Sequence, residues 1–355
     1  MLNHDMTILA IDLGKRSGVF CDYDAPTAQA AYGKVKMTRQ AMHDLLSERS
    51  PDRLVIEIGP AAGWIHDLAA SMGIEIQVAN TNHEAWRWKH VKNKTDRRDA
   101  LRLAQLSAMN QLPMVYMPDP VVRAWRSLIA YRRTLVKRRT QIKNNIRAIL
   151  DREGLSMPAG KSGWTKQSLG ALSEMASVDD GALWRFELGV ELALLGPLQR
   201  EIAEVEKRLN KIAGRNESVQ RLKQAPAVGD RLAEAIVAII DDPHRFARGR
   251  DVGCYVGMTP RIFQSGTMDH QGRISGAGNA MLRSLLVEVA WLGVKRFKVP
   301  WMVAVYERVR RGSEKRKKTA IVAVARRLLI RCWAMLRDET PWREPEAGVA
   351  LRLVA

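Results

Sequence analysis

Two short apolar runs near the start of the chain decide its fold. Residues 7–13 read TILAIDL and end before Gly14, and residues 53–58 read RLVIEI and end before Gly59-Pro60. Apolar runs of this length that stop at glycine or proline are typical of buried β-strands. Each run carries one acid near its end, Asp12 or Glu57. A carboxylate is costly to bury unless it is paired or bound to a metal.

The segments around these runs predict an α/β layer. Further strands are expected at residues 17–23, 30–37 and 74–79, and helices at residues 38–46, 61–72 and 94–108. Thr38 is a suitable N-cap for the first helix. Three strands followed by alternating helices and strands indicate a sheet covered by helices.

The composition shifts at Pro113, Pro118 and Pro120, which predicts a domain boundary. A long helix is expected at residues 123–150, and residues 195–212 form an a/d seam with Pro197 at its first turn. These two helices could pair with each other or with another subunit. Residues 154–180 are loop-rich, residues 257–279 are irregular, and the rest of the chain from residue 217 is mostly helical. The predicted domains are therefore residues 1–112, 113–216 and 217–355.

The charge balance points to a polyanionic partner. The chain has 57 Lys and Arg residues against 38 Asp and Glu residues, a formal net charge of +19. Nucleic acid is the first inference from such an excess, and a membrane surface is the rival. No apolar run is long enough to span a bilayer, and the first residues lack the layout of a signal peptide. Three scattered cysteines suggest no disulfide framework, so we expect a protein of the reducing cytoplasm, without a membrane.

The long basic helix is the candidate nucleic-acid surface. It contains no acid to compensate its charge, which favours an anion-facing surface over an ordinary solvated face. Three further arginines lie in or near the irregular segment. The predicted nucleic-acid-binding residues are Arg123, Arg126, Arg132, Arg133, Lys137, Arg138, Arg139, Lys143, Arg147, Arg261, Arg273 and Arg283.

Four acids form the candidate catalytic set. Asp12 and Glu57 lie in strands, and Asp96 and Asp99 share one face of a helix because they are three residues apart. Carboxylates gathered from strands and a helix are what hard divalent cations need, and such ions assist phosphoryl transfer. Each acid alone is weak evidence, since a strand-ending Asp is often a turn residue and the helical pair could form surface ion pairs with neighbouring arginines.

The irregular segment holds the candidate nucleophiles. Ser265 precedes Gly266 in a polar loop. From the residues alone, Ser275 is an equally good candidate nucleophile. The predicted arginines at 261, 273 and 283 could supply the cations that phosphodiester attack needs. From composition alone, Ser265 is more often a turn serine, and His270 more often a plain loop histidine than a base.

A short glycine turn lies at residues 225–233. It is similar to a helix-hairpin-helix turn, which presents backbone N–H groups to a phosphate, although Ala227 stands where that motif usually has Gly. A plain helix N-terminus is an equally good interpretation.

In combination these motifs resemble the Asp-Glu-Asp-Asp transposases of insertion sequences, the "one-ten" family. The resemblance is carried by Asp12, Glu57, the Lys94–Ala100 block and the Pro260-Arg261…Ser265-Gly266 block, and it spans nearly the whole chain. It implies a RuvC-like, ribonuclease-H-like N-terminal domain followed by a C-terminal transposase domain. The sequence departs from the family pattern at Gln264, Thr267 and Met268.

The resemblance also implies a mechanism and partners. Asp12, Glu57, Asp96 and Asp99 would hold one or two magnesium ions, and Ser265 would form a phosphoserine link with DNA. A bridging non-coding RNA would pair with donor and target DNA, and a homodimer or homotetramer would share composite sites.

Three other functions are compatible with parts of the sequence. A RuvC-like Holliday-junction nuclease needs the four acids and no serine, but it leaves the chain after residue 112 without a role. An actin-like kinase or ATPase would use residues 11–14 as a phosphate loop, but it needs a second such loop. A non-catalytic nucleic-acid-binding protein would not depend on a metal. The expected function is therefore DNA transposition or recombination by an enzyme.

Overall fold

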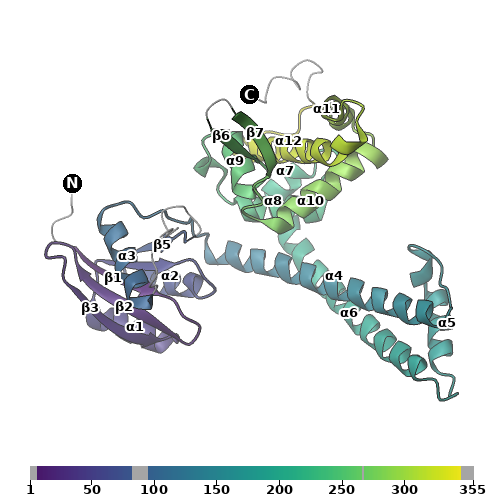
Figure 1. Cartoon of the computed structure of the whole chain (residues 1–355), viewed down its shortest axis with the longest axis horizontal. Helices are drawn as coiled ribbons and strands as arrows, with labels where there is room; N and C mark the ends of the chain where they lie inside the picture. Colours follow the sequence, from purple (N-terminus) through teal and green to yellow (C-terminus); the bar gives the residue numbers. More distant parts are fainter. Residues whose placement is uncertain (1–5, 82–94, 266–267, 345–355) are drawn as a thin grey trace. The chain divides into compact units, whose positions relative to one another are not determined.

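The computed structural model describes residues 6–81, 95–265 and 268–344. The chain divides into two compact units, Met1–Pro120 and Val121–Ala355 (Figure 1). The first unit is a sheet with helices on both faces. The second combines a long helical hairpin with a helical bundle.

The first unit holds a five-stranded sheet in the order β3-β2-β1-β4-β5. β1 pairs antiparallel with β2 and parallel with β4, and β2–β3 and β4–β5 extend the sheet antiparallel and parallel, respectively. β1 and β4 are the two apolar runs of the sequence, and they lie side by side in the middle of the sheet. The strands are β1 Thr7–Asp12, β2 Ser17–Asp24, β3 Ala30–Lys36, β4 Arg53–Glu57 and β5 Glu75–Ala79.

Alternation along β1 sends its side chains to two different layers. Leu9 and Ile11 join the core with α1 (Arg39–Arg49) and α2 (Ala62–Ser71). Ile8 and Ala10 join the core with α3 (Asp96–Ala108) on the other face. The predicted mixed α/β layer is confirmed, with element ends within three residues of those expected and Thr38 as the N-cap of α1.

Two long antiparallel helices form a hairpin in the second unit (Figure 1). They are α4 (Pro120–Arg152) and α6 (Leu183–Gly214). Side-chain hydrogen bonds join them, with Asn145 donating to Glu191 and Arg152 donating to Glu187, each at 2.8 Å. Of the two predicted modes of pairing, the structure therefore has the one within the chain.

Two predictions for this hairpin were wrong. Pro197 lies inside α6 and not in its first turn, because α6 begins at Leu183. Buried Leu195 and Ile202 lie on either side of Pro197 in the sequence, and their packing offsets the hydrogen bond that proline removes. The segment interpreted as loop-rich contains α5 (Lys166–Ala176) and the short helix η2 (Ser162–Trp164), which pack at the end of the hairpin.

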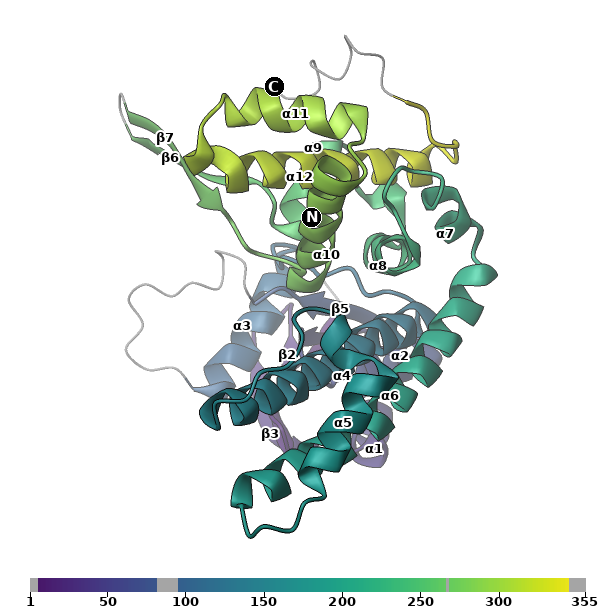
Figure 2. The same ribbon diagram turned by 90° about the vertical axis from the view of Figure 1, so that its right-hand side faces the viewer.

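The rest of the second unit is a helical bundle with one β-hairpin (Figure 2). The helix α12 (Lys317–Arg337) is buried along much of its length. The predicted irregular segment is instead mostly the two-stranded sheet β6–β7. The other elements are α7 Glu217–Leu222, α8 Asp230–Ile240, η3 Pro243–Arg245, α9 Gly249–Val256, β6 Pro260–Ser265, β7 Met268–Ile274, α10 Ala280–Trp291, η4 Leu292–Arg296, α11 Pro300–Arg310 and η5 Glu314–Arg316.

Among the described residues, no helix is both long enough and apolar enough to cross a membrane.

Candidate functional site

The first two predicted catalytic acids lie at the same end of neighbouring parallel strands. Ile11 of β1 pairs with Ile56 of β4, so Asp12 and Glu57 are the next residues in register. Ala10 of β1 and Val55 of β4 point into the core beneath α3. Asp12 and Glu57 lie two residues farther along the same strands, so their side chains are on that same face. The sheet therefore directs both carboxyl groups toward the α3 face.

Helix α3 brings its first turn to that same end of the sheet. Its far end is anchored at the start of β4, where the guanidinium of Arg53 donates to the Ser107 hydroxyl at 3.2 Å and pairs with Glu75 at 2.9 Å. Ala100 and Leu103 pack on the strands between the two ends. α3 thus runs opposite to β1 and β4, and its N-terminus lies near their carboxyl ends.

The first turn of α3 carries the other two predicted acids. Thr95 caps the helix by accepting from the backbone N–H of Arg98 at 3.4 Å, and Asp96 and Asp99 follow within that turn. Asp96 is exposed, whereas Asp99 is half-buried like the two strand acids. The favourable interaction of acids with a helix N-terminus offsets part of their mutual repulsion.

The topology gathers the four acids without forming a finished metal cage. Among the side chains that the structure describes, no three of His, Cys, Asp or Glu are arranged to hold a metal ion. Carboxylate oxygens are nevertheless the donors that a hard divalent cation requires. The donor chemistry at this end of the sheet fits such a cation.

The cysteines belong to other parts of the structure. Cys21 lies beneath α3, and burial, together with the charge of Asp22, raises the pKa of its thiol to about 11. Burial raises the pKa of the Cys332 thiol to about 12. Both thiols are buried small hydrophobic groups, whereas Cys254 is exposed, and all three cysteines are free, in agreement with the absence of a predicted disulfide framework.

The two candidate serines lie at opposite ends of the β6–β7 hairpin. Ser265 ends β6 and pairs with Met268, the first residue of β7, whereas Ser275 follows the last residue of β7. At 3.3 Å per residue, the length of the hairpin separates them by roughly 20 Å. The Ser275 backbone is held at the root, where its N–H donates to the Thr259 carbonyl at 2.8 Å. The side chains of Ser265 and His270 lie outside the described part of the structure.

The hairpin root depends on two glycines with positive φ. Gly257 (φ 76°) and Gly278 (φ 81°) let the end of α9 and the segment before α10 approach backbone to backbone. A Cβ at Gly257 would overlap the carbonyl of Ala277, and one at Gly278 would overlap that of Tyr255. No other residue type fits here without moving the main chain.

Two of the predicted phosphate-binding arginines reinforce this root. Arg283 donates to the carbonyls of Val256 and Ala277 at 2.8 and 2.9 Å. Arg261 donates to the Ser275 carbonyl at 3.2 Å. A third predicted arginine, at position 273, is exposed on β7. The positive charge around the hairpin is therefore partly structural, which the sequence did not indicate.

The basic face of α4 divides into two classes of side chain. Arg126 donates to carbonyls at the end of α8, those of residues 238 and 239, at 2.5 and 2.9 Å. Arg132 binds Glu206 of α6 through two nitrogens. In contrast, Arg133 and Lys137 form no ion pair with any described residue and line a groove of about 650 Å³ between α4, α8 and α10.

Farther along α4, basic residues pack against the end of the helical hairpin. Lys143 and Arg147 lie over the ring of Trp164, at 4.4 and 5.2 Å from its centroid. Burial, with the charges of Arg139 and Arg147, lowers the pKa of Lys143. Of the remaining predicted residues, 138 is exposed, and 123 and 139 are half-buried. Nucleic-acid binding by this face stays a prediction.

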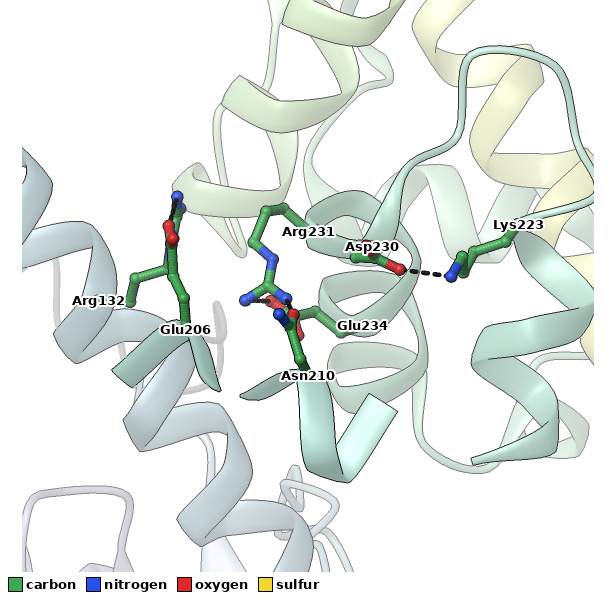
Figure 3. A network of polar contacts seen from close by, with 7 residues as sticks. All are labelled: Arg132, Glu206, Asn210, Lys223, Asp230, Arg231 and Glu234. Atoms are coloured by element: carbon green, nitrogen blue, oxygen red, sulfur yellow. Dashed lines mark hydrogen bonds and ion pairs between the residues drawn. The ribbon is translucent and has the colours of Figure 1, made fainter. Parts of the chain in front are cut away.

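A polar network joins α8 to the long helix α6 and to α7 (Figure 3). Arg231 pairs with Glu234 at 3.1 Å and donates to Asn210 of α6, and Lys223 pairs with Asp230 at 2.7 Å. Sequence reasoning missed this network, because an Arg and a Glu three residues apart read as an ordinary surface pair.

The acid at the centre of the network is deeply buried. Glu234 is 1% exposed, and within the described part of the chain its Oε2 atom has no hydrogen-bond partner. Burial raises the pKa of this carboxyl to about 7, although the charge of Arg231 opposes the shift. The side chain therefore changes its protonation near neutral pH.

The glycine turn before α8 has the backbone of a tight hairpin. Ala227 adopts φ 66°, the left-handed region that favours glycine. This explains why a glycine is usual at this position of the resembled motif. Gly229 is the N-cap of α8 and has open space around the position of a missing Cβ.

Two family models match separate parts of the chain. Residues 9–154 match the model described as "Transposase", a DEDD-type transposase domain of IS110 elements. Residues 219–307 match the model described as "Transposase IS116/IS110/IS902 family". The first match covers the four acids and α4, and the second covers the serine hairpin. The DEDD-type domain suggests a ribonuclease-H-like fold and dependence on a divalent metal.

Relatives align along most of the chain. The transposase for insertion sequence element IS1111A of Coxiella burnetii is 28% identical, over 96% of this chain and 92% of its own length. The transposase for insertion sequence element IS1328 of Yersinia enterocolitica is 24% identical, over 82% of this chain and 85% of its own. A pilin gene-inverting protein of Moraxella lacunata is 24% identical, over 79% of this chain and 72% of its own length.

Proposed function

The chain belongs to the IS110 family of insertion-sequence transposases, and we propose that it cuts and rejoins DNA through a phosphoserine intermediate guided by a bridging RNA. The observation that carries this proposal is the convergence of Asp12, Glu57 and the first turn of α3 at one end of the sheet. These acids are assigned to the metal site, and Ser265 is assigned as the nucleophile.

The carboxylates of Asp12, Glu57, Asp96 and Asp99 would hold one or two magnesium ions. A bound divalent ion would supply charge stabilisation to the phosphoryl oxygens and the leaving oxygen. The chain's own part is to hold four acids at one sheet end, where the dipole of α3 favours their ionised forms.

In the proposed reaction the Ser265 oxygen attacks the phosphorus of a DNA phosphodiester. A P–O bond to Ser265 forms, the P–O bond to one deoxyribose oxygen breaks, and the proton of the serine hydroxyl passes to that leaving oxygen. Attack by a DNA hydroxyl on the phosphoserine reverses these steps and restores the serine. No bond energy is lost to hydrolysis, so strand exchange needs no external energy source.

The hairpin geometry favours Ser265 over Ser275 as the nucleophile. Ser265 lies at the distal end of β6, away from the contacts that hold the root. Ser275 has its N–H and its carbonyl both engaged at the root, with Thr259 and Arg261. A nucleophile that must meet a phosphate on large DNA partners needs the distal position. A homodimer or homotetramer would then pair the serine of one subunit with the acids of another.

Trapping of a covalent adduct tests the proposal. The full chain would be incubated with magnesium, a candidate bridging RNA and labelled element-end DNA, and then denatured. We expect protein-linked label from the wild type and from Ser275→Ala, and none from Ser265→Ala or Asp12→Ala. Omission of the RNA should abolish adduct formation on the matched DNA.

Two outcomes would contradict the proposal. DNA cleavage that needs Asp12 but leaves no adduct in any variant would replace it with RuvC-like hydrolysis. An adduct that is lost in Ser275→Ala and kept in Ser265→Ala would move the nucleophile to the hairpin root. Melting temperatures of the variants would be compared, to show that each is folded.

A further inference from the structure

A π turn directly follows α10 (Ala280–Trp291). After Trp291 the helix widens into the π turn η4, in which the N–H of Phe297 donates to the Leu292 carbonyl at 2.9 Å. Gly293 packs so tightly on Met302 of α11 that a Cβ would overlap its sulfur. π turns are rare and are concentrated at functional sites.

This turn presents an aromatic ring among three cations. Lys295, Arg296, Phe297 and Lys298 are all exposed, and Phe297 keeps 53% of its surface accessible. The Arg296 guanidinium lies 5.6 Å from the Phe297 ring centroid. None of the three cations forms an ion pair within the part of the chain that the structure describes. Proteins that bind single-stranded nucleic acid use exposed aromatic rings, on which bases stack, together with neighbouring cations.

Phe297 also forms one wall of a groove that includes the hairpin turn before α8. The groove has a volume of about 550 Å³, and Ala227 and Gly229 are among the residues that line it. Grooves of roughly 300–1,000 Å³ are typical of sites for small ligands.

The acids of this groove are largely compensated by neighbouring cations. Glu206 pairs with Arg132 of α4, and Asp230 pairs with Lys223 at the end of α7. The third acid in the groove, Glu288, lies on the exposed side of α10. With two of the three acids paired, one acid of the described lining keeps no ion pair, and the exposed cations at positions 295, 296 and 298 adjoin Phe297 along the chain.

We propose that this groove binds one unpaired nucleotide, whose base stacks on Phe297 and whose phosphate lies near Arg296 and Lys298. The inference rests on the proposed function, in which the chain handles RNA and separated DNA strands. A base inside a duplex cannot stack on the ring, because both of its faces are already covered. The site therefore selects single-stranded segments, and stacking makes it tolerant of sequence.

The test compares single-stranded and duplex oligonucleotides that carry 2-aminopurine, as RNA and as DNA. Phe297→Ala should weaken single-strand binding by about 5- to 100-fold, the effect of losing one stacked base. Phe297→Tyr keeps a ring and should restore binding. Phe186→Ala is the matched control, because Phe186 is 75% exposed on α6, outside this groove. Duplex affinity should be unchanged in all three variants.

The fluorescence of 2-aminopurine reports stacking directly and should change on binding to the wild type but not to Phe297→Ala. The RNA and DNA arms show which strand occupies the site. Unchanged single-strand affinity of Phe297→Ala, or equal losses on duplex and single strand, would overturn the inference. The Ser265 adduct assay separates this result from the proposed function, since the adduct can persist when the stacking site is absent.

Discussion

The acid-bearing end of the N-terminal sheet and the serine-bearing hairpin of the C-terminal unit are built in different ways. Asp12 and Glu57 end two neighbouring inner strands of a sheet that helices cover on both faces. Ser265 ends a strand with one neighbour, in a hairpin held at its root by Gly257 and Gly278. Local alternation therefore decides which face of the sheet the two strand acids take, whereas contacts between distant segments hold the root of the serine hairpin.

The largest expected effect comes from breaking the hairpin root. Gly278→Ala would force a Cβ against the Tyr255 carbonyl at a positive φ. We expect a loss of about 3 kcal/mol in the free energy of unfolding, with loss of adduct formation. Urea unfolding followed by tryptophan fluorescence would measure the change.

Gly59→Ala is the matched control in the N-terminal unit. Gly59 follows Glu57 closely, has no atom near the position of a Cβ and has no positive φ. Its replacement should change stability by less than about 0.5 kcal/mol. A similar loss from both substitutions would show that the two regions do not differ as described.

Glu234 tests whether the bundle next to the hairpin depends on pH. Its folded pKa of about 7 exceeds its ordinary value of 4.5, because the carboxyl is buried. The folded chain keeps a proton that the unfolded chain releases between these values, so stability falls as pH rises through this window. Glu234→Gln does not titrate and should gain about 3 kcal/mol relative to the wild type between pH 4.5 and pH 7.

Unfolding free energies of both proteins across that pH range would check this prediction. A difference between variant and wild type that stays constant with pH would contradict it. Asp44→Asn, a change to an exposed acid in the other unit, serves as the control.

The two classes of basic residue on α4 should separate stability from affinity. Arg126→Ala removes two hydrogen bonds to the end of α8 and should cost about 2 kcal/mol of stability. Lys137→Ala should leave stability unchanged and reduce the slope of log affinity against log salt by about 1. Calorimetry and binding titrations at several salt concentrations would measure both quantities. An unchanged salt slope in Lys137→Ala would remove this face from the nucleic-acid surface.

The smallest expected effect is an increase in the free energy of unfolding. Ala227→Gly relieves a left-handed backbone and should stabilise the second unit by about 1 kcal/mol. Gly73→Ala, at φ 73° in the N-terminal unit, should cost a similar amount. A rise in melting temperature for the first variant and a fall for the second would confirm that both turns need this conformation.

Local sequence patterns predicted much of the fold. The wrong predictions concern segments whose structure depends on packing against distant parts of the chain. Strands β1 and β4 were predicted from apolar runs, and α1 from Thr38 at its cap. The β6–β7 hairpin was read as irregular because its polar residues carry no period-2 apolar signal. Pro197 was read as a helix start because proline favours that position, but the packing of α6 overrides that preference.

Some residues of the candidate site were predicted from the sequence, whereas the roles of others became clear only from the structure. Residue order and alternation were enough to choose the four acids as a set and to expect a nucleic-acid partner from a net charge of +19. Residue order could not separate Arg126, which caps α8, from Lys137, which lines a groove. Nor could it reveal the burial of Glu234 or the exposure of Phe297.

Strand and helix periods are local properties of the chain, so its amino-acid order predicted the strands and helices of the N-terminal layer and the positions of Asp12 and Glu57 in two of those strands. Burial, ion pairing and the approach of one backbone to another depend on segments far apart in the chain. The three-dimensional packing therefore determined which cations remain available and how the serine hairpin is held, because those contacts exist only once the helices have assembled.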